Sequence, residues 1–584
     1  MSGPAPGAGA TLRLAVGPDL GPGENVAGDV SGAAWTYLLP RRQVRAILSL
    51  GHLPSATERT LLDIAEELIV TPDSGIAEGR STEGDATIRE LGPVQGARWP
   101  LADASVELIV ATDRAWTRRL AEEPALATDL QRVVTPEGFI FVQLAGEPEL
   151  ASGDGHLPAG FARRDLLWLS TSSDEVRAAA PARDRCAIRF LVSHSRKRTG
   201  AWLPSRLRDL TRRLRGRRVP SALLQSTGAV RWRDGSQGLD APPQYLIEAA
   251  ASAGLDISRH GWALVEPGTY LTKKPLIFLF APESPKPELV VKLAREARLN
   301  HRVENALRAL QMLDGQPSTL RRAFPRAAFS GEHGGLAFLA ETVIHGTPLQ
   351  EHLARQASDA QLRGMVEWLI DLGLATADAG VATATEIAGG LDEMLQQFIA
   401  IYRPAERYRR FLAAQIERVS MATAPFPLVL QHGDAGTWNV LVDEDAQPHL
   451  IDWEASVPHG LPLWDLFYFF RSFAVRESKL RGSRDTLAAF IRQFLQAGPL
   501  LAPLSQSCAR FCAESGLEPR LVEPLFYTCW MHRALKEAST LATSSLRHGH
   551  YVKLLLRCID ADQAPGLSHL FGGAMGRSVG SDRS

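Results

Sequence analysis

The segment 431–454, which reads Q-H-G-D-A-G-T-W-N-V-L-V-D-E-D-A-Q-P-H-L-I-D-W-E, constrains the fold more than any other stretch. It places Asp434 and Asn439 close enough to share one tight loop, and Asp452 follows later in the segment. Between Asn439 and Asp452, two short apolar runs flank a polar turn, which is the pattern of a β-hairpin. The hairpin is expected to fold Asp452 back beside Asn439.

Phosphoryl transfer to a hydroxyl uses a carboxylate that faces the acceptor and oxygen ligands that hold magnesium. The H-G-D-x-x-x-x-N and I-D-W-E patterns resemble the catalytic core of the aminoglycoside phosphotransferase and choline kinase family, small-molecule relatives of the protein kinases. The resemblance implies that Asp434 is the catalytic base and that Asn439 and Asp452 bind Mg²⁺. It also implies that His432 supports the loop and that Asp465 caps the following helix.

The resemblance extends upstream to residue 242. The apolar runs 276–280 and 288–293 predict adjacent strands, with Lys292 on the second. In the family, a lysine at this place binds the α and β phosphates of the nucleotide and pairs with a Glu on the next helix. Glu304 is expected in that role, with Glu296 as the alternative.

Two further segments are expected to contact the nucleotide, which is ATP or GTP. The segment 337–349 resembles the strand and hinge between the two lobes, so backbone groups near Glu341 are expected to meet the purine. The segment 266–270 takes the place of the phosphate-covering turn but has one glycine where a full Gly-rich loop has three.

The short stretch 453–464 leaves no room for the long activation segment with which protein kinases dock a polypeptide. A small-molecule acceptor is therefore expected, such as a sugar or an amino alcohol. Glu454 is interpreted either as an aid to acceptor or metal positioning or as a surface ion pair. The family builds its acceptor pocket in the helical region 485–570. Four residues of this region are interpreted as part of an ordinary packed or solvated helix in preference to acceptor contacts: Trp530, His532, Arg533 and Lys536.

From residue 31 to 192, short apolar runs alternate with helical patterns, which predicts a parallel α/β sheet. The runs expected as strands are 46–50, 67–70, 106–110, 139–142 and 188–192. The segments 99–110 and 132–139 resemble the middle and late strands of class I S-adenosylmethionine methyltransferases. The turn 50–56, however, has one glycine followed by a proline, and Asp73 lies out of register for a ribose-binding acid. These departures favour a methyltransferase-like scaffold that no longer methylates over an active methyltransferase, and S-adenosylmethionine is not expected as a cofactor.

Composition sets further limits. The 584 residues exceed what one core supports, and the net charge of -1 gives no global argument for binding nucleic acid or membrane. The five cysteines are too few and too irregularly spaced for a disulfide framework or a zinc site, so they are expected as buried thiols. No apolar run has the ~20 residues of a membrane span. A cytoplasmic protein is expected, with disordered termini at 1–30 and 574–584.

A basic connector follows at 193–241. Within it, the segment 203–218 has leucines at helical spacing on one face and arginines around the rest. Packing of the leucines between domains is favoured over contact with a membrane surface or an anionic glycan. Nucleic-acid binding is not expected, because the segment lacks interleaved aromatic residues.

These observations predict an α/β N-terminal Rossmann-like, methyltransferase-like domain and an α+β bilobal protein-kinase-like domain. The lobes of the second domain are expected at 242–343 and 344–573. The expected function is ATP-dependent phosphorylation of a small-molecule hydroxyl. Two alternatives remain open: a bifunctional kinase and S-adenosylmethionine-dependent methyltransferase, and a catalytically dead kinase fold that serves as a binding module.

Overall fold

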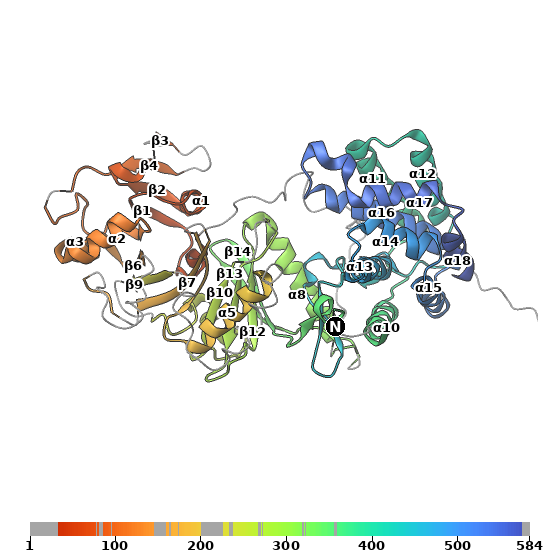
Figure 1. Cartoon of the computed structure of the whole chain (residues 1–584), viewed down its shortest axis with the longest axis horizontal. Coiled ribbons are helices and arrows are strands. Elements are labelled where there is room, and N and C mark those ends of the chain that lie inside the picture. Colours follow the sequence, from red (N-terminus) through yellow and green to blue (C-terminus); the bar gives the residue numbers. More distant parts are fainter. Residues whose placement is uncertain are drawn as a thin grey trace, which may run out of the picture. The chain divides into compact units, whose positions relative to one another are not determined.

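The computed structural model divides the chain into two compact units (Figure 1). The sheet unit comprises Ala27–Val303 and Ala327–Val343, and the helical unit comprises Glu304–Arg326 and Ile344–Ser584. The structure describes residues 33–76, 79–80, 86–94, 96–144, 159–162, 165–172, 175–199, 226–232, 238–266, 270, 272–317, 320–321, 323–354 and 359–574. The expected basic helix 203–218, the expected disordered N-terminus, the expected disordered tail after Ala574 and most of the segment 266–270 lie outside this part of the chain.

The sheet unit contains one sheet, whose described strands follow the order β13-β14-β12-β11-β10-β8-β7-β9-β6-β5-β1-β2-β4-β3. Five of these strands are parallel, in the order β4-β2-β1-β5-β6, so the order reverses between β1 and β5. They are β1 (Val44–Leu50), β2 (Ala65–Val70), β4 (Thr87–Glu90), β5 (Val106–Ala111) and β6 (Val134–Leu144). The short β3 (Gly79–Arg80) pairs with β4 at the edge. The strands predicted at 46–50, 67–70, 106–110 and 139–142 are confirmed.

The parallel strands are apolar along their length because both faces of the sheet are covered. In β1, Ile47 belongs to one buried cluster, while Ala46 and Leu48 belong to another on the opposite face. Three helices join the parallel strands and supply much of this cover: α1 (Ser55–Ile64), α2 (Arg114–Glu122) and α3 (Pro124–Val133).

The other strands of the sheet are antiparallel to their neighbours. They are β7 (Leu166–Ser172), β8 (Glu175–Pro181), β9 (Ser226–Trp232), β10 (Gly261–Val265), β11 (Leu276–Phe280), β12 (Leu289–Leu293), β13 (Ala327–His333) and β14 (Leu336–Thr342). The strands predicted at 276–280 and 288–293 are confirmed. β8 pairs with β10 through Ala179 and Leu264, so the sheet continues from the N-terminal strands into those that carry Lys292.

The strand predicted at 188–192 is wrong, because these residues lie within α5 (Arg185–Thr199). The Asp184 carboxylate accepts a hydrogen bond from the Ala187 N–H at 2.9 Å and so satisfies a backbone donor at the start of the helix. Ala187 and Leu191, one helical turn apart, are both buried in a cluster that includes Phe278. Helix α7 (Gln244–Ser252) follows later in the same unit.

The helical unit is built mainly of helices (Figure 1). They are α8 (Asn300–Asp314, which begins in the sheet unit), α9 (Leu349–His352), α10 (Asp359–Ala375), α11 (Ala384–Tyr402), α12 (Glu406–Ser420), α13 (Trp464–Leu480), α14 (Thr486–Phe490), α15 (Leu501–Ser515), α16 (Val522–Ala538), α17 (His550–Asp560) and α18 (Pro565–Ala574). Short 3-10 or π turns of this unit lie at Trp453–Ala455, Ile491–Leu495, Pro519–Leu521 and Thr543–His548, and those of the sheet unit lie at Ala34–Leu38, Pro72–Ser74 and Ala297–Leu299. Helix α16 is buried along most of its length and packs against α11, α12, α13 and α17.

Two small sheets flank the loop that contains Asp434. β17 (Val440–Val442) pairs with β15 (Thr347–Pro348) and with β18 (Pro448–Leu450). β16 (Val429–Gln431) pairs with β19 (Val457–Gly460). These pairings fix both ends of the loop.

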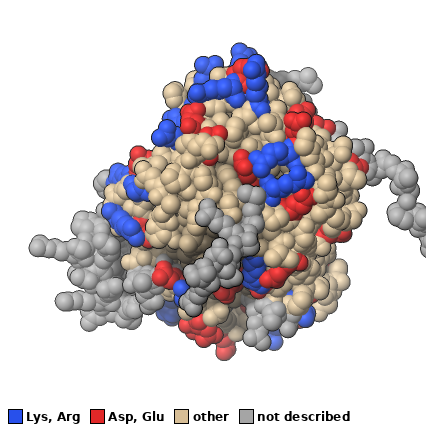
Figure 2. Space-filling model, turned by 90° about the vertical axis from the view of Figure 1, so that its right-hand side faces the viewer, with Lys and Arg blue, Asp and Glu red and all other residues tan. Residues whose placement is uncertain are grey.

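The distribution of surface charge fits the near-zero net charge of the chain, and the state of the cysteines fits the expectation of buried thiols. On the face shown in Figure 2, Lys and Arg lie close to Asp and Glu and are separated by wide uncharged areas. All five cysteines are free, and every one except Cys186 is buried. None of the helices in the described ranges has both the length and the apolar character that crossing a bilayer requires.

Candidate active site

The loop between β16 and β17 carries Asp434 and Asn439, and the hairpin of β17 and β18 leads the chain back to Asp452. The predicted hairpin is confirmed, since Val440 pairs with Leu450 and the Ile451 N–H donates to the Asn439 carbonyl at 2.9 Å. Asn439 and Asp452 therefore flank the paired ends of the hairpin. Asp452 adopts the left-handed backbone conformation, with φ 71°.

Asp434 is held by three side-chain donors. Its Oδ2 accepts from Asn439 Nδ2 at 3.0 Å and from Trp438 Nε1 at 3.2 Å, and its Oδ1 accepts from Arg533 Nη2 at 2.9 Å. Asn439 Nδ2 also donates to the Asp434 carbonyl at 2.9 Å. The amide nitrogen of Asn439 is therefore committed to Asp434, which leaves the side-chain oxygen as a ligand atom.

The residues present fit a magnesium site. Magnesium prefers oxygen ligands and is held by one or two carboxylates together with substrate phosphates and water. The Asn439 side-chain oxygen and the Asp452 carboxylate provide such ligands at adjoining ends of the hairpin. Within the described ranges, no group of three or more His, Cys, Asp or Glu side chains could enclose a metal alone.

His432 supports the loop as a neutral side chain. Its Nδ1 accepts from the Asp434 N–H at 3.1 Å, so Nε2 carries the proton and donates to the Ile451 carbonyl at 3.1 Å. Its ring packs edge-on against Trp453, with centroids 4.6 Å apart. Burial lowers the pKa of His432, which favours this neutral form. The side chain thereby ties the loop to the hairpin.

Asp465 also supports the loop, although the cap predicted for the following helix is wrong. The carboxylate lies in the first turn of α13, while Leu463 occupies the N-cap position. It accepts from the backbone N–H of His432 at 2.5 Å and of Gly433 at 3.0 Å. Buried backbone donors need acceptors, and these two find theirs on Asp465.

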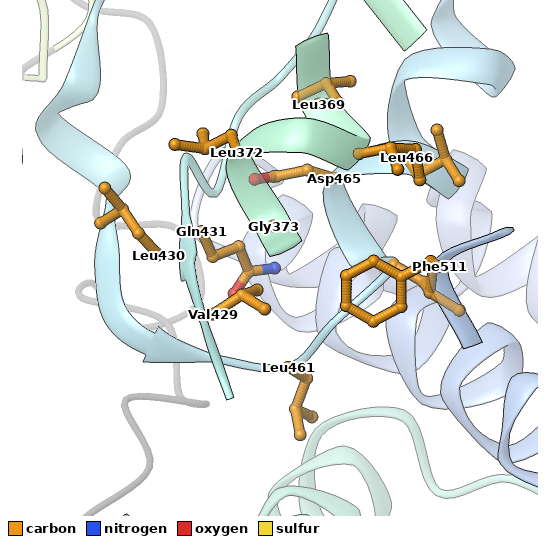
Figure 3. Close-up of a pocket in the computed structure, with 12 residues that line it drawn as sticks. Leu369, Leu372, Gly373, Val429, Leu430, Gln431, Leu461, Asp465, Leu466 and Phe511 are labelled. Atoms are coloured by element: carbon orange, nitrogen blue, oxygen red, sulfur yellow. The ribbon is translucent and has the colours of Figure 1, made fainter. Parts of the chain in front are cut away.

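A small cavity lies beside Asp465 (Figure 3). Its volume is about 30 Å³, and Gln431 and Asp465 are the polar residues among its mainly apolar lining. A space of this size holds about one water molecule. It is therefore too small for a substrate.

Two cations from α16 contact the loop, so the helix is packed, as the sequence predicts, and part of its packing is against the residues around Asp434. Arg533 Nη1 donates to the Gly433 carbonyl at 2.8 Å, and Lys536 Nζ donates to the same oxygen at 3.1 Å. The Arg533 guanidinium lies 3.4 Å from the centre of the Tyr468 ring. Burial alone raises the pKa of Asp434, but Arg533 and Lys536 hold it below its usual value. A sequence signal existed, because Arg533 and Lys536, three positions apart, share one face of a helix that is mainly apolar before them.

The sheet unit carries Lys292 on β12. Its ammonium forms an ion pair with Glu341 on the neighbouring strand β14, and the two side chains are 12% and 5% exposed. The sequence predicts Glu304 or Glu296 as the partner, whereas the structure pairs Lys292 with Glu341. Adjacent strands bring side chains on the same face into contact, which explains this choice. Glu296 pairs with Arg298 at 2.7 Å, and Glu304 is exposed.

A second buried ion pair lies at the start of the segment 266–270. Glu266 follows β10 directly, and its carboxylate contacts Arg295 at 2.6 Å, with both side chains almost fully buried. The Glu266 N–H also donates to the Arg177 carbonyl on β8 at 2.8 Å. The start of this segment is therefore fixed to the sheet.

The crevice between the ends of β1 and β5 is filled by a side chain. The Asp73 carboxylate accepts from Trp116 Nε1 at 2.7 Å. A Cβ atom on Gly51, which follows β1, would lie 2.6 Å from Trp116 Cδ1. Trp116 also packs against Trp99, with ring centroids 5.6 Å apart. The indole thus closes the point where the strand order reverses.

Part of the chain matches a known protein family. Residues 278–506 match the phosphotransferase enzyme family, so the C-terminal part of the chain contains a domain of that family. The curated proteins contain no significant match.

Several solved structures are similar to the chain at low identity. An aminoglycoside phosphotransferase from Streptomyces rimosus is 16% identical, with 48% of this chain and 93% of that chain covered and a TM-score of 0.29. An aminoglycoside-3'-phosphotransferase of type VIII is 20% identical, with coverages of 46% and 94% and a TM-score of 0.26. The bifunctional kinase-methyltransferase WbdD is 12% identical, with 91% of both chains covered and a TM-score of 0.24. At these TM-scores the likenesses support no conclusion about this chain.

Proposed function

We propose that the protein is an ATP-dependent phosphotransferase that phosphorylates a hydroxyl group of a small molecule. The observation that carries this proposal is the arrangement of Asp434, Asn439 and Asp452. The side-chain nitrogen of Asn439 donates to Asp434, so its side-chain oxygen is available as a metal ligand beside the proposed catalytic carboxylate. The match of residues 278–506 to the phosphotransferase enzyme family supports the same class of reaction.

In this proposal, Asp434 orients the acceptor hydroxyl and takes its proton as the bond to phosphorus forms. Its depressed pKa keeps the carboxylate ionised at neutral pH. A carboxylate of low basicity is a weak base, so positioning is the larger part of its contribution. Bound magnesium, held by Asn439 and Asp452, supplies the positive charge that neutralises the phosphates.

Lys292 is proposed to bind the nucleotide phosphates, with Glu341 holding its ammonium in place. The pair is largely buried, which fixes a side chain that is flexible when exposed. Glu304 and the backbone near Glu341 remain candidates for nucleotide contacts.

Magnesium-dependent release of ADP tests the proposed function. The protein is incubated with Mg-ATP and a panel of sugars, sugar acids and amino alcohols, and ADP is measured against a reaction without acceptor. We expect at least one acceptor to raise the rate. A protein that binds no Mg-ATP by calorimetry and releases no ADP with any acceptor would favour the catalytically dead binding module.

We also propose that the parallel part of the sheet is a methyltransferase-like scaffold that binds no S-adenosylmethionine. Its order β4-β2-β1-β5-β6 is that of a doubly wound sheet, in which ligands bind at the carboxyl ends of strands where the order reverses. Trp116 fills that crevice and engages Asp73, the acid nearest to the ribose position. This packing supports a scaffold over the bifunctional alternative.

Calorimetry with S-adenosylmethionine separates the two. We expect no binding at millimolar ligand in the natural protein. Saturable binding, or methylation of any acceptor that also stimulates ADP release, would instead support the bifunctional enzyme.

A further inference from the structure

The three side chains that donate to the Asp434 carboxylate differ in how deeply they are buried. The Asp434 side chain is 28% exposed, whereas that of Arg533 is 8% exposed. Asn439 is also 8% exposed, but Trp438 is 41% exposed although its Nε1 donates to Asp434. A molecule that approaches Asp434 from solvent therefore arrives beside Trp438, because the other two donors are buried.

The indole of Trp438 is held in place by its neighbours. Gly436 lies against the ring, since a Cβ atom on this glycine would lie 2.3 Å from Trp438 Cζ2. The ring of Tyr468 stands perpendicular to the indole, with centroids 5.8 Å apart. The hydrogen bond from Nε1 to Asp434, at 3.2 Å, orients the ring further. Trp438 thus presents a fixed apolar surface beside the carboxylate.

The side chains around Asp434 give no strong preference for a charged ligand. Asp434 forms an ion pair with Arg533 at 2.9 Å, and both Arg533 and Lys536 donate to the Gly433 carbonyl. A further acid, Asp465, accepts from backbone N–H groups of the loop that carries Asp434. Charges of both signs are therefore matched within the protein. The uncharged surface of Trp438 is what remains for the recognition of an acceptor.

We infer that Trp438 determines the class of acceptor: it packs against the C–H face of a sugar ring, and one hydroxyl of that ring donates to Asp434. This inference rests on the proposed function and names its substrate class. A pyranose ring is rigid and has an apolar face with hydroxyls around its rim, so it can cover an aromatic ring and reach a carboxylate at the same time. An open-chain polyol or amino alcohol would lose more conformational freedom on binding.

Calorimetric titration of the full chain compares ring compounds with open-chain compounds of similar size. The ring probes are the methyl pyranosides of glucose, galactose and mannose, and the open-chain probes are sorbitol, galactitol and mannitol. Choline is added as a quaternary cation, because aromatic faces also bind cations. Each titration is run with magnesium and a non-hydrolysable ATP analogue. We expect at least one pyranoside to bind about tenfold or more tightly than every alditol and than choline.

Two substitutions separate the ring face of Trp438 from its N–H group. Trp438→Ala removes both and should weaken pyranoside binding by about tenfold or more. Trp438→Phe keeps an aromatic face without Nε1, so it should retain most of this affinity. Neither substitution should change the affinity for the ATP analogue, which a general loss of structure would lower. Leu480→Ala, at the exposed last residue of α13, is the matched control and should change neither affinity.

The inference is overturned if no pyranoside binds, or if an alditol or choline binds as tightly as the best pyranoside. It is also overturned if Trp438→Ala binds that pyranoside as well as Leu480→Ala does, or if Trp438→Phe loses as much affinity as Trp438→Ala. A titration with the ATP analogue alone reports on the proposed function. A protein that binds the analogue but no pyranoside contradicts only the inference, whereas one that binds a pyranoside but no analogue contradicts the proposed function.

Discussion

At the scale of single residues, Asp434 is defined by its donors. Arg533 fixes one carboxylate oxygen, while Trp438 and Asn439 share the other. A buried carboxylate without such partners would hold its proton more tightly. Arg533 is therefore a positioning residue that keeps Asp434 ionised and oriented.

Removal of Arg533 should change the pH dependence of turnover. In the natural protein the pKa of Asp434 lies below its ordinary value of 3.8, so kcat should not fall as pH drops from 7 toward 5. Burial raises the pKa of Asp434, and in Arg533→Gln the guanidinium no longer counteracts this effect. The pKa of Asp434 should therefore rise, and kcat should begin to fall at a higher pH than in the natural protein. Arg533→Lys should lie between the two.

The control is Arg410→Gln, which removes an exposed arginine that pairs with Glu406. Its profile should match that of the natural protein. Identical profiles for Arg533→Gln and Arg410→Gln would show that Arg533 does not act on the base.

At the scale of elements, the conformation of the loop that carries Asp434 depends on a glycine. Gly433 has φ 74°, and a Cβ at this position would lie 2.0 Å from the Ala455 carbonyl oxygen. The Ala455 carbonyl is part of the backbone, so moving it away from a new Cβ atom would cost more free energy than moving the end of a flexible side chain. The loop and the turn after β18 are therefore packed directly against each other.

Gly433→Ala should lower both kcat and the melting temperature. The matched control is Gly482→Ala, which shares a positive φ of 88° but has no atom within 4 Å of its Cβ. The control should lose only the ~1–2 kcal/mol of left-handed strain, with kcat unchanged. Equal effects of the two substitutions on kcat and melting temperature would contradict the close approach of loop and turn.

Much of this element could be predicted from the sequence, because its information is local. The spacing of Asp434 and Asn439 and the hairpin before Asp452 follow from short-range patterns. The partners of Asp465 and Lys292 could not be predicted, because each pairing joins segments far apart in the chain. The strand expected at 188–192 was wrong for a related reason: a short apolar run fits a buried helix as well as a strand.

At the scale of the whole molecule, the N-terminal strands and the strands around Lys292 belong to one compact unit. The sequence instead predicts two domains here, joined by a connector at 193–241. β8 pairs with β10, and Glu266 donates to the Arg177 carbonyl on β8. Trp168 and Ala180 share a buried cluster with Val265 and Phe278. The strand β10, which leads into the segment 266–270, therefore depends on the N-terminal strands for its neighbour and for part of its core.

A chain beginning at residue 238 should consequently be less stable than the full protein. It would expose the edge of β10 and the apolar residues of this cluster, and exposed apolar edges promote aggregation. We expect a lower melting temperature and aggregation by size-exclusion chromatography. A monomeric fragment with the full melting temperature would mean that the shared sheet contributes little.

The central claim is that Asp434 acts in transfer of the phosphoryl group and not in binding of the nucleotide. The most direct measurement compares ADP release and Mg-ATP affinity in the natural protein and in Asp434→Asn. The account predicts that the affinity is unchanged within about twofold, while turnover falls by about 10²-fold or more, the usual contribution of a general base. Unchanged turnover in Asp434→Asn, in a protein that binds Mg-ATP normally, would contradict it.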